Sequence, residues 1–113
     1  MPYIHTQTTV SLPPRIREEL TGDFGQAVRV LGKSENWLML RFEENCAMAF
    51  RGKTDGEYCF IGVSMYGCPE KDQLEAMTQK VTACVAARTG IPAENIYIRY
   101  LPTDAWGWNG GNF

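Results

Sequence analysis

The first two residues of the chain, Met1-Pro2, carry the first chemistry that the sequence suggests. An initiator methionine is usually trimmed when the second residue is small, so the mature chain would begin with the secondary amine of Pro2. A free α-amino group has a reference pKa of about 7.7 to 8.0, and burial or a nearby cation lowers it. Such an amine could serve as a general base near neutral pH. The alternative reading is an ordinary chain terminus.

The other reactive side chains do not suggest a metal centre or a redox pair. The sequence holds one histidine and four cysteines, whose spacings of 13, 9 and 16 residues include no C-x-x-C: Cys46, Cys59, Cys68 and Cys84. These numbers do not complete a common zinc set. We therefore expect no metal ligands and free, mostly buried thiols, with a disulfide pair left open. His5 is expected to be a polar residue with an ordinary hydrogen-bond partner.

The length and charge of the chain limit the classes of partner. With 113 residues, 44% of them hydrophobic, the sequence predicts a single domain spanning residues 1–113. The net charge of −2 and the lack of a basic tract argue against nucleic acid or an anionic membrane as partner. No transmembrane window or signal peptide is visible. A cytoplasmic location is expected, with export by a route lacking a signal peptide left open.

An internal repeat predicts the elements that must position the Pro2 amine. Residues 31–42 and 89–100 align at an offset of 58, with glycine on glycine and arginine on arginine. Each segment follows a helical pattern, and Gly32 and Gly90 stand where a left-handed helix cap is needed. Helix starts are expected at Ser11 with Pro13-Pro14 and at Cys68-Pro69. The pseudo-repeats cover about residues 2–50 and 58–108.

Each helical pattern also has a strand pattern before it and after it. Residues 2–10 are rich in Thr, Ile and Tyr, and residues 58–65 form a nearly continuous apolar run, typical of a strand buried on both faces. The order is β-α-β followed by β-α-β, with a short segment at residues 47–50 between. We expect an α+β fold, a two-layer sandwich in which a four-stranded mixed sheet carries two helices on one face. Alternation along the last strand places Tyr97 and Arg99 together on the other face. Large side chains on that face predict an oligomer that covers it.

Several short motifs, in order along the whole chain, resemble one known family. They are Met1-Pro2, Leu31-Gly32-Lys33, Met48-Ala49-Phe50, Tyr97 and the ending Gly107-Trp108-Asn109-Gly110-Gly111-Asn112-Phe113. Together they resemble the macrophage migration inhibitory factor family of the tautomerase superfamily. The resemblance implies a homotrimer whose three sheets enclose a central channel, with active sites at the subunit interfaces. It also implies tautomerase activity on phenylpyruvate-like or dopachrome-like substrates, and for some members a cytokine role.

Keto–enol tautomerisation needs a base and a group that stabilises the enolate, and it requires no cofactor. The resemblance implies that Pro2 is the catalytic base and that Lys33 supplies positive charge to the substrate and lowers the pKa of the amine. By position, Ser64 with the backbone of Met65, and Tyr97 from a neighbouring subunit, would also line the pocket. An aromatic wall would suit an aryl-bearing 2-oxo acid; it would consist of Trp37, Trp106, Trp108 and Phe113.

Three positions depart from the vertebrate cytokine of this family. Arg99 replaces an asparagine and is expected either to bind a substrate carboxylate or to form a salt bridge between subunits. Tyr66 replaces a glycine and could narrow the entrance to the pocket. The stretch Glu57-Tyr58-Cys59-Phe60 lacks the second thiol of a C-x-x-C, so no thiol–disulfide activity is expected.

Each of these residues also has a structural interpretation. Lys33 next to a capping glycine could simply favour the helix dipole, and the tryptophans could be packing residues. Three functions therefore remain. The first is a Pro2-dependent tautomerase. The second is a cytokine-like protein that binds a receptor, and the third is another reaction on a small carboxylic acid, such as hydration, dehalogenation or decarboxylation.

Overall fold

Two β-α-β units follow one another along the chain and contribute to one sheet. The structure is a computed structural model that describes residues 1–113. The strands and helices are β1 (Pro2–Thr8), α1 (Pro14–Ala27), β2 (Met39–Glu43), β3 (Cys59–Tyr66), α2 (Lys71–Thr89), β4 (Ile96–Thr103), β5 (Gly107–Trp108) and β6 (Gly111–Asn112). Short 3₁₀ turns occupy Val28–Leu31, Glu35–Trp37 and Ala93–Asn95.

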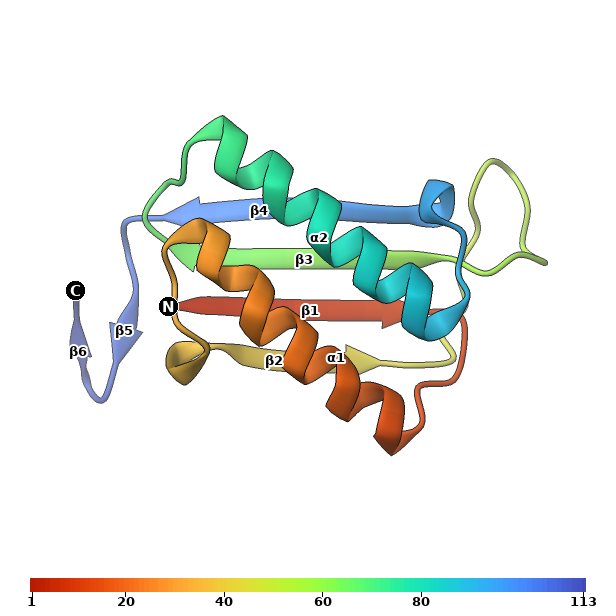
Figure 1. The fold of residues 1–113 in the computed structure, drawn as a ribbon, viewed down its shortest axis with the longest axis horizontal. Coiled ribbons are helices and arrows are strands. Elements are labelled where there is room, and N and C mark those ends of the chain that lie inside the picture. The colour runs from red at the N-terminus through yellow and green to blue at the C-terminus, as the bar shows by residue number, and fades with distance from the viewer.

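The sheet has the order β2-β1-β3-β4. Strand β1 runs parallel to β2 and antiparallel to β3, and β3 runs parallel to β4. Both helices cross the same face of the sheet, and the hairpin β5–β6 lies beyond the end of the sheet where both termini are found (Figure 1). The predicted α+β class, with a four-stranded mixed sheet and both helices on one face, is therefore confirmed. No helix has the length and apolar character needed to cross a membrane.

The hydrophobic core lies between the helices and the sheet. Along β1 buried residues alternate with half-buried ones, so that Pro2, Ile4, Thr6 and Thr8 face the helices. The core side chains that are fully buried come from both helices, the central strands and the loops after β1 and α2; the largest are Phe24, Ile4, Leu12, Leu20, Ile61, Met65, Met77 and Ile91. The opposite face of the sheet carries no helix (Figure 1). It is called here the open face.

The ends of the helices follow the sequence signals in part. Gly32 and Gly90 have φ values of 71° and 78°, so both predicted left-handed caps are confirmed. The predicted start of the second helix at Cys68-Pro69 was wrong by two residues. Glu70 is the N-cap of α2 and forms a capping box with Gln73, whose side chain accepts from the Glu70 backbone N–H at 2.8 Å.

Other expectations agree with the structure only in part. The short segment expected at residues 47–50, between the two units, forms no strand, and Phe50 makes only an isolated bridge with Lys53. On the open face, Phe60, Ser64 and Tyr66 of strand β3 are half-buried and only Gly62 is buried, so the expectation that this strand is buried on both faces was wrong for the single chain. All four cysteines are free, but only Cys59 is buried and Cys68 is exposed. The expectation of mostly buried thiols was therefore wrong as well.

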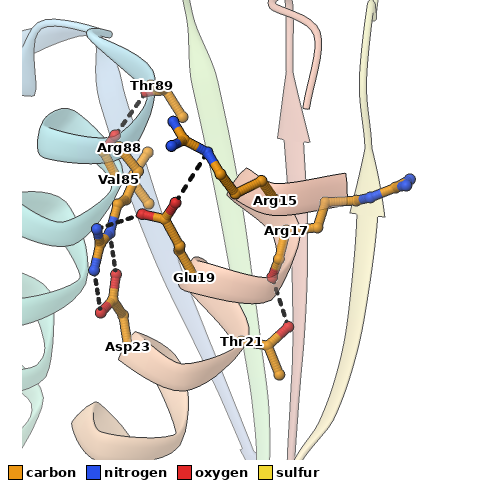
Figure 2. A network of polar contacts seen from close by, with 8 residues as sticks. All are labelled: Arg15, Arg17, Glu19, Thr21, Asp23, Val85, Arg88 and Thr89. Carbon is orange, nitrogen blue, oxygen red and sulfur yellow. Dashed lines mark hydrogen bonds and ion pairs between the residues drawn. The ribbon is translucent and has the colours of Figure 1, made fainter. Parts of the chain in front are cut away.

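A polar network joins the outer surfaces of the two helices (Figure 2). Arg88 on α2 donates to Asp23 from Nε at 3.0 Å and from Nη2 at 3.2 Å, and it also contacts Glu19 on α1. Arg15 lies 3.4 Å from Glu19. The hydrogen bond to Asp23 raises the pKa of Arg88. The network fixes one helix against the other far from Pro2.

Candidate active site

The N-terminal end of β1 adjoins an open cavity. Pro2 is buried and pairs with Met65 across the antiparallel ladder. A cavity of about 710 Å³ opens beside it, between β1, the turn before β2 and the C-terminal hairpin; it is lined by Met1, Pro2, Tyr3, Asn36, Trp37, Leu38, Met39, Trp106, Gly107 and Trp108. A second large cavity, of about 540 Å³, lies around Cys46 and Asp55 in the loop after β2. Only the first cavity contains a group that could act as an amine base.

Lys33 reaches this end of the sheet because it follows the helix cap directly. Its backbone N–H donates to the carbonyl of Val28 at 3.1 Å, which closes the turn after α1. The half-buried side chain then extends to the end of β3, where Nζ donates to the backbone oxygen of Tyr66 at 2.6 Å. The backbone N–H of the same Tyr66 donates to the carbonyl of Met1 at 3.3 Å. Lys33, Tyr66 and the start of the chain therefore meet at one point.

The surroundings of this point disfavour a protonated amine. Burial lowers the pKa of the Met1 amine below its ordinary value, and the positive charge of Lys33 lowers it further. While Met1 is attached, the nitrogen of Pro2 is an amide and cannot act as a base. Removal of Met1 would place the chain-terminal amine one residue further into the same surroundings.

Aromatic side chains border the cavity on the side of the C-terminal hairpin. The rings of Trp37 and Trp108 meet edge to face with centroids 5.0 Å apart. The hairpin turns back so that the backbone N–H of Phe113 donates to the carbonyl of Trp106 at 3.0 Å. The ring of Phe113 lies 5.5 Å from that of Tyr66. Three tryptophans thus line the cavity, whereas Phe113 lies next to Tyr66 beside it.

The structure does not bring Tyr97 and Arg99 to Pro2 within one chain. Tyr97 pairs with Phe60, whereas Pro2 pairs with Met65, five positions further along β3. At about 3.3 Å per residue, that offset separates them by roughly 17 Å. Tyr97 packs against Phe50 with ring centroids 5.1 Å apart. The guanidinium carbon of Arg99 lies 5.2 Å from the centre of the Phe60 ring.

Arg99 and Tyr97 share the open face, as predicted, with other large side chains. The exposed fractions there are 67% for Met39, 58% for Tyr97 and 48% for Leu101. Ser64 is half-buried on this face between Tyr3 and Leu101. The single chain therefore assembles Pro2, Lys33, Met65 and the tryptophans at one end of the sheet, with Phe113 beside them. Ser64, Tyr97 and Arg99 lie on the open face.

Sequence reasoning did not identify several residues that line the cavity: Tyr3, Asn36, Leu38, Met39 and Gly107. One signal was present, because the alternation of residues 37–42 was visible in the sequence. The register that places Met39 beside Tyr3 was not visible. Parallel pairing is set by the packing of the intervening helix, which a single sequence does not specify.

His5 has an ordinary partner on the open face, as expected. Its Nε2 lies 2.6 Å from a carboxylate oxygen of Glu43, and Arg41 lies 3.3 Å from the same oxygen. Within the described chain no three His, Cys, Asp or Glu side chains gather in a way that could hold a metal ion.

Comparisons with known proteins agree with this arrangement. The family model for macrophage migration inhibitory factor matches residues 1–113. The crystal structure of Leishmania major MIF2 has 34% sequence identity and a TM-score of 0.94, covering 100% of this chain and 97% of that one. The macrophage migration inhibitory factor homologue from Prochlorococcus marinus has 27% identity and a TM-score of 0.87, covering 98% of each chain.

A third structure shares the fold at lower identity. Macrophage migration inhibitory factor from Toxoplasma gondii has 20% identity and a TM-score of 0.90, covering 98% of this chain and 99% of that one. A search of the curated proteins found no match.

Proposed function

This chain belongs to the macrophage migration inhibitory factor family, and we propose that it is a cofactor-independent keto–enol tautomerase whose base is the amine of Pro2. The family is part of the tautomerase superfamily, a group of isomerase-type enzymes. The observation that carries the proposal is the position of the chain start. It lies beside Lys33 and a cavity of about 710 Å³, where burial and charge both lower the pKa of an amine.

The proposed reaction moves one proton and leaves the electron count unchanged. In the trimmed chain, the neutral Pro2 nitrogen accepts a proton from the carbon next to the carbonyl of a 2-oxo acid. The electron pair of that C–H bond forms the C=C bond, and the carbonyl π electrons move to oxygen as an enolate. The Pro2 ammonium then donates the proton to this oxygen. The enol leaves and the amine is neutral again.

The cavity walls favour an aryl-bearing substrate such as phenylpyruvate. Trp37, Trp106 and Trp108 give one side a large aromatic surface. An aromatic ring packed against such a wall gains about 0.5–1.5 kcal/mol beyond simple burial. Lys33 is the cation within reach of a carboxylate or an enolate at this end of the sheet.

A homotrimer would complete the site. Tyr97 lies roughly 17 Å along the sheet from Pro2, so it can reach a Pro2 cavity only from a second copy of the chain. The open face, with Met39, Tyr97 and Leu101 exposed, is the surface that such an assembly would cover. We propose that Tyr97 and Arg99 enter the cavity of a neighbouring subunit.

The experiment is a phenylpyruvate tautomerase assay on protein whose intact mass shows that Met1 is absent. Wild-type protein and Pro2→Gly are compared, since glycine also permits methionine removal but provides a primary amine without the ring. We expect activity in the wild type and a loss in Pro2→Gly. No activity in the trimmed, correctly assembled wild-type protein would contradict the proposal and favour a receptor-binding role.

One observation keeps a different substrate class under consideration. Arg99 makes no ion pair within the chain and lies across Phe60 on the open face. A guanidinium without a carboxylate partner could bind the second carboxylate of a small diacid from a neighbouring subunit. Comparing phenylpyruvate with a 2-oxo diacid that lacks an aryl group tests this second candidate. A preference for the diacid that is lost in Arg99→Gln would favour it.

A further inference from the structure

We propose that Phe50 is a positioning residue for the cavity of a neighbouring subunit: it holds the ring of Tyr97 in the orientation from which Tyr97 enters that cavity. The inference rests on the proposed function, in which Tyr97 acts across a subunit boundary. It assigns a task to the loop between β2 and β3, which lies at the opposite end of the sheet from both chain termini (Figure 1).

Phe50 lies between two tyrosine rings. Its ring meets that of Tyr58 edge to face with centroids 5.8 Å apart, and that of Tyr97 edge to face with centroids 5.1 Å apart. Such pairs are stabilised beyond the simple burial of their surface. Tyr58 is buried, Phe50 is half-buried and Tyr97 is 58% exposed. Phe50 therefore connects an exposed ring to one that is fixed in the protein interior.

A tight turn fixes Phe50 itself. The backbone N–H of Phe50 donates to the carbonyl of Lys53 at 2.9 Å, and the N–H of Lys53 donates back at 3.0 Å. Between them Arg51 and Gly52 have φ values of 54° and 75°, as in a type I′ turn. Positive φ is uncommon for arginine, and surrounding contacts must hold it. The guanidinium carbon of Arg51 lies 4.9 Å from the centre of the Phe50 ring, and its Nη2 donates to the carbonyl of Glu94, just before β4, at 3.4 Å.

The space beside Tyr97 shows what the ring would do without this support. A cavity of about 130 Å³ borders both Phe50 and Tyr97, and all but one of its lining residues are hydrophobic; they are Met48, Ala49, Phe50, Tyr58, Cys59, Phe60, Asn95 and Tyr97. Leucine at position 50 would remove the edge-to-face contact and enlarge this cavity. Because an exposed ring gains free energy by moving into an apolar space, Tyr97 would then turn away from the neighbouring subunit.

The first test compares Phe50→Leu with Phe42→Leu in trimmed protein. Phe42 is also half-buried, but it lies on β2 and stacks on Phe24 with centroids 6.4 Å apart. We expect Phe50→Leu to lower kcat/KM for phenylpyruvate about 2- to 12-fold, the range that corresponds to the loss of one aromatic pair. Phe50→Tyr, which keeps the ring, should retain the wild-type value. Phe42→Leu should lower Tm and leave kcat/KM unchanged, and equal losses of kcat/KM in the two leucine variants would overturn the proposal.

A double-mutant cycle tests whether Phe50 acts through Tyr97. Tyr97→Ala removes the ring that Phe50 is proposed to hold. Phe50→Leu should therefore lower kcat/KM in the wild-type background and have no further effect in the Tyr97→Ala background. The same fold-loss in both backgrounds would show that Phe50 acts by another route.

A second measurement does not depend on turnover. The protein is labelled with 3-fluorotyrosine, and Tyr97→Phe identifies the Tyr97 resonance among the five tyrosines. Phenylacetate, which carries a carboxylate where phenylpyruvate carries its carbonyl, is the probe. In trimmed wild-type protein it should shift the Tyr97 resonance; in Phe50→Leu that resonance should have moved already and should respond less. A Tyr97 resonance that is the same in Phe50→Leu and the wild type would overturn the positioning role.

The two proposals can fail separately. Trimmed wild-type protein without tautomerase activity would remove the proposed function, while the fluorine spectra would still report whether Phe50 holds Tyr97. An active enzyme whose kcat/KM and Tyr97 resonance are unchanged by Phe50→Leu would remove only the role of Phe50 and leave Pro2 as the base.

Discussion

Two buried threonines on the same strand give opposite predictions for the same substitution. Thr6 and Thr8 both lie on the helix-facing side of β1, and each is 0% exposed. The hydroxyl of Thr8 donates to the carbonyl of Val10 at 2.8 Å. The hydroxyl of Thr6, between Phe42 and Ile61 in the sheet register, has no hydrogen-bond partner. Valine has nearly the same shape as threonine and the same preference for strands.

The magnitude follows from the cost of a buried polar group. An unsatisfied buried hydroxyl costs about 1–3 kcal/mol, whereas a typical hydrogen bond contributes about 0.5–1.5 kcal/mol to stability. We expect Thr6→Val to raise the free energy of unfolding by about 1 kcal/mol or more. Thr8→Val should lower it by about 1 kcal/mol, because it removes a hydrogen bond that is made.

The assay is denaturant unfolding of the wild type and both variants at one protein concentration, since oligomerisation shifts apparent stability. The m-values should stay equal, so that differences in midpoint report stability alone. If Thr6→Val were destabilised as much as Thr8→Val, the hydroxyl of Thr6 would have a partner in solution and the reasoning would be wrong.

Three further predictions concern the cavity, a thiol and the helix pair. Trp108→Ala should raise KM for phenylpyruvate about 2- to 12-fold, the equivalent of about 0.5–1.5 kcal/mol. It should leave KM for a 2-oxo acid without an aromatic ring nearly unchanged. Equal effects on both substrates would show that Trp108 does not contact the aryl group. Burial raises the pKa of the Cys59 thiol from 9.0 to about 12. Because the unfolded chain loses the Cys59 proton at a lower pH than the folded chain, the free energy of unfolding should fall between pH 9 and pH 12 by up to about 1.4 kcal/mol per pH unit. Cys59→Ala should make this pH dependence less steep. An unchanged slope would show that the Cys59 thiol does not cause it. Arg88→Ala should lower Tm more than Arg15→Ala, because Arg88 contacts both Glu19 and Asp23. The difference in Tm between the two variants should become smaller at high salt, which screens exposed charges. A difference that salt does not change would contradict an electrostatic role for Arg88.

Local sequence signals predicted the C-terminal caps of both helical segments correctly but placed the start of α2 two residues too early. Gly32 and Gly90 mark the ends of both helical segments because only glycine adopts positive φ without strain. The start of α2 was misplaced because Pro69 was taken as the first helical residue, whereas the pair Glu70 and Gln73 supplies a reciprocal cap. Two competing signals for the helix start, two residues apart, cannot be ranked without the geometry of the turn.

The strands show a different limit. Alternation correctly placed Tyr97 and Arg99 on one face, because side chains alternate strictly along a strand. It could not place these residues relative to Pro2, since that distance depends on the register between β1, β3 and β4. The missing hydrogen bond of Thr6 is likewise a product of tertiary packing and leaves no trace in the sequence.

For the candidate site too, positions set by local signals could be predicted from the sequence, whereas contacts between distant segments could not. The position of Lys33 could be predicted, because this residue directly follows a helix cap that the sequence reveals; its role in a site stays a prediction. Its hydrogen bond to the carbonyl of Tyr66, and the contact of Tyr66 with Met1, join segments far apart in the chain. Such contacts follow from the pairing of β1 with β3, and no local pattern encodes them.

The most direct test of the central claim compares two forms of the same chain that differ only in Met1. Phenylpyruvate tautomerase activity is measured on protein whose intact mass shows Met1 removed and on protein that retains it. The trimmed form should be active, with kcat/KM rising through a titration below the usual range of an α-amino group, about 7.7 to 8.0. The form with Met1 should be inactive, because its Pro2 nitrogen is an amide. Equal activity of the two forms would show that the Pro2 amine is not the base.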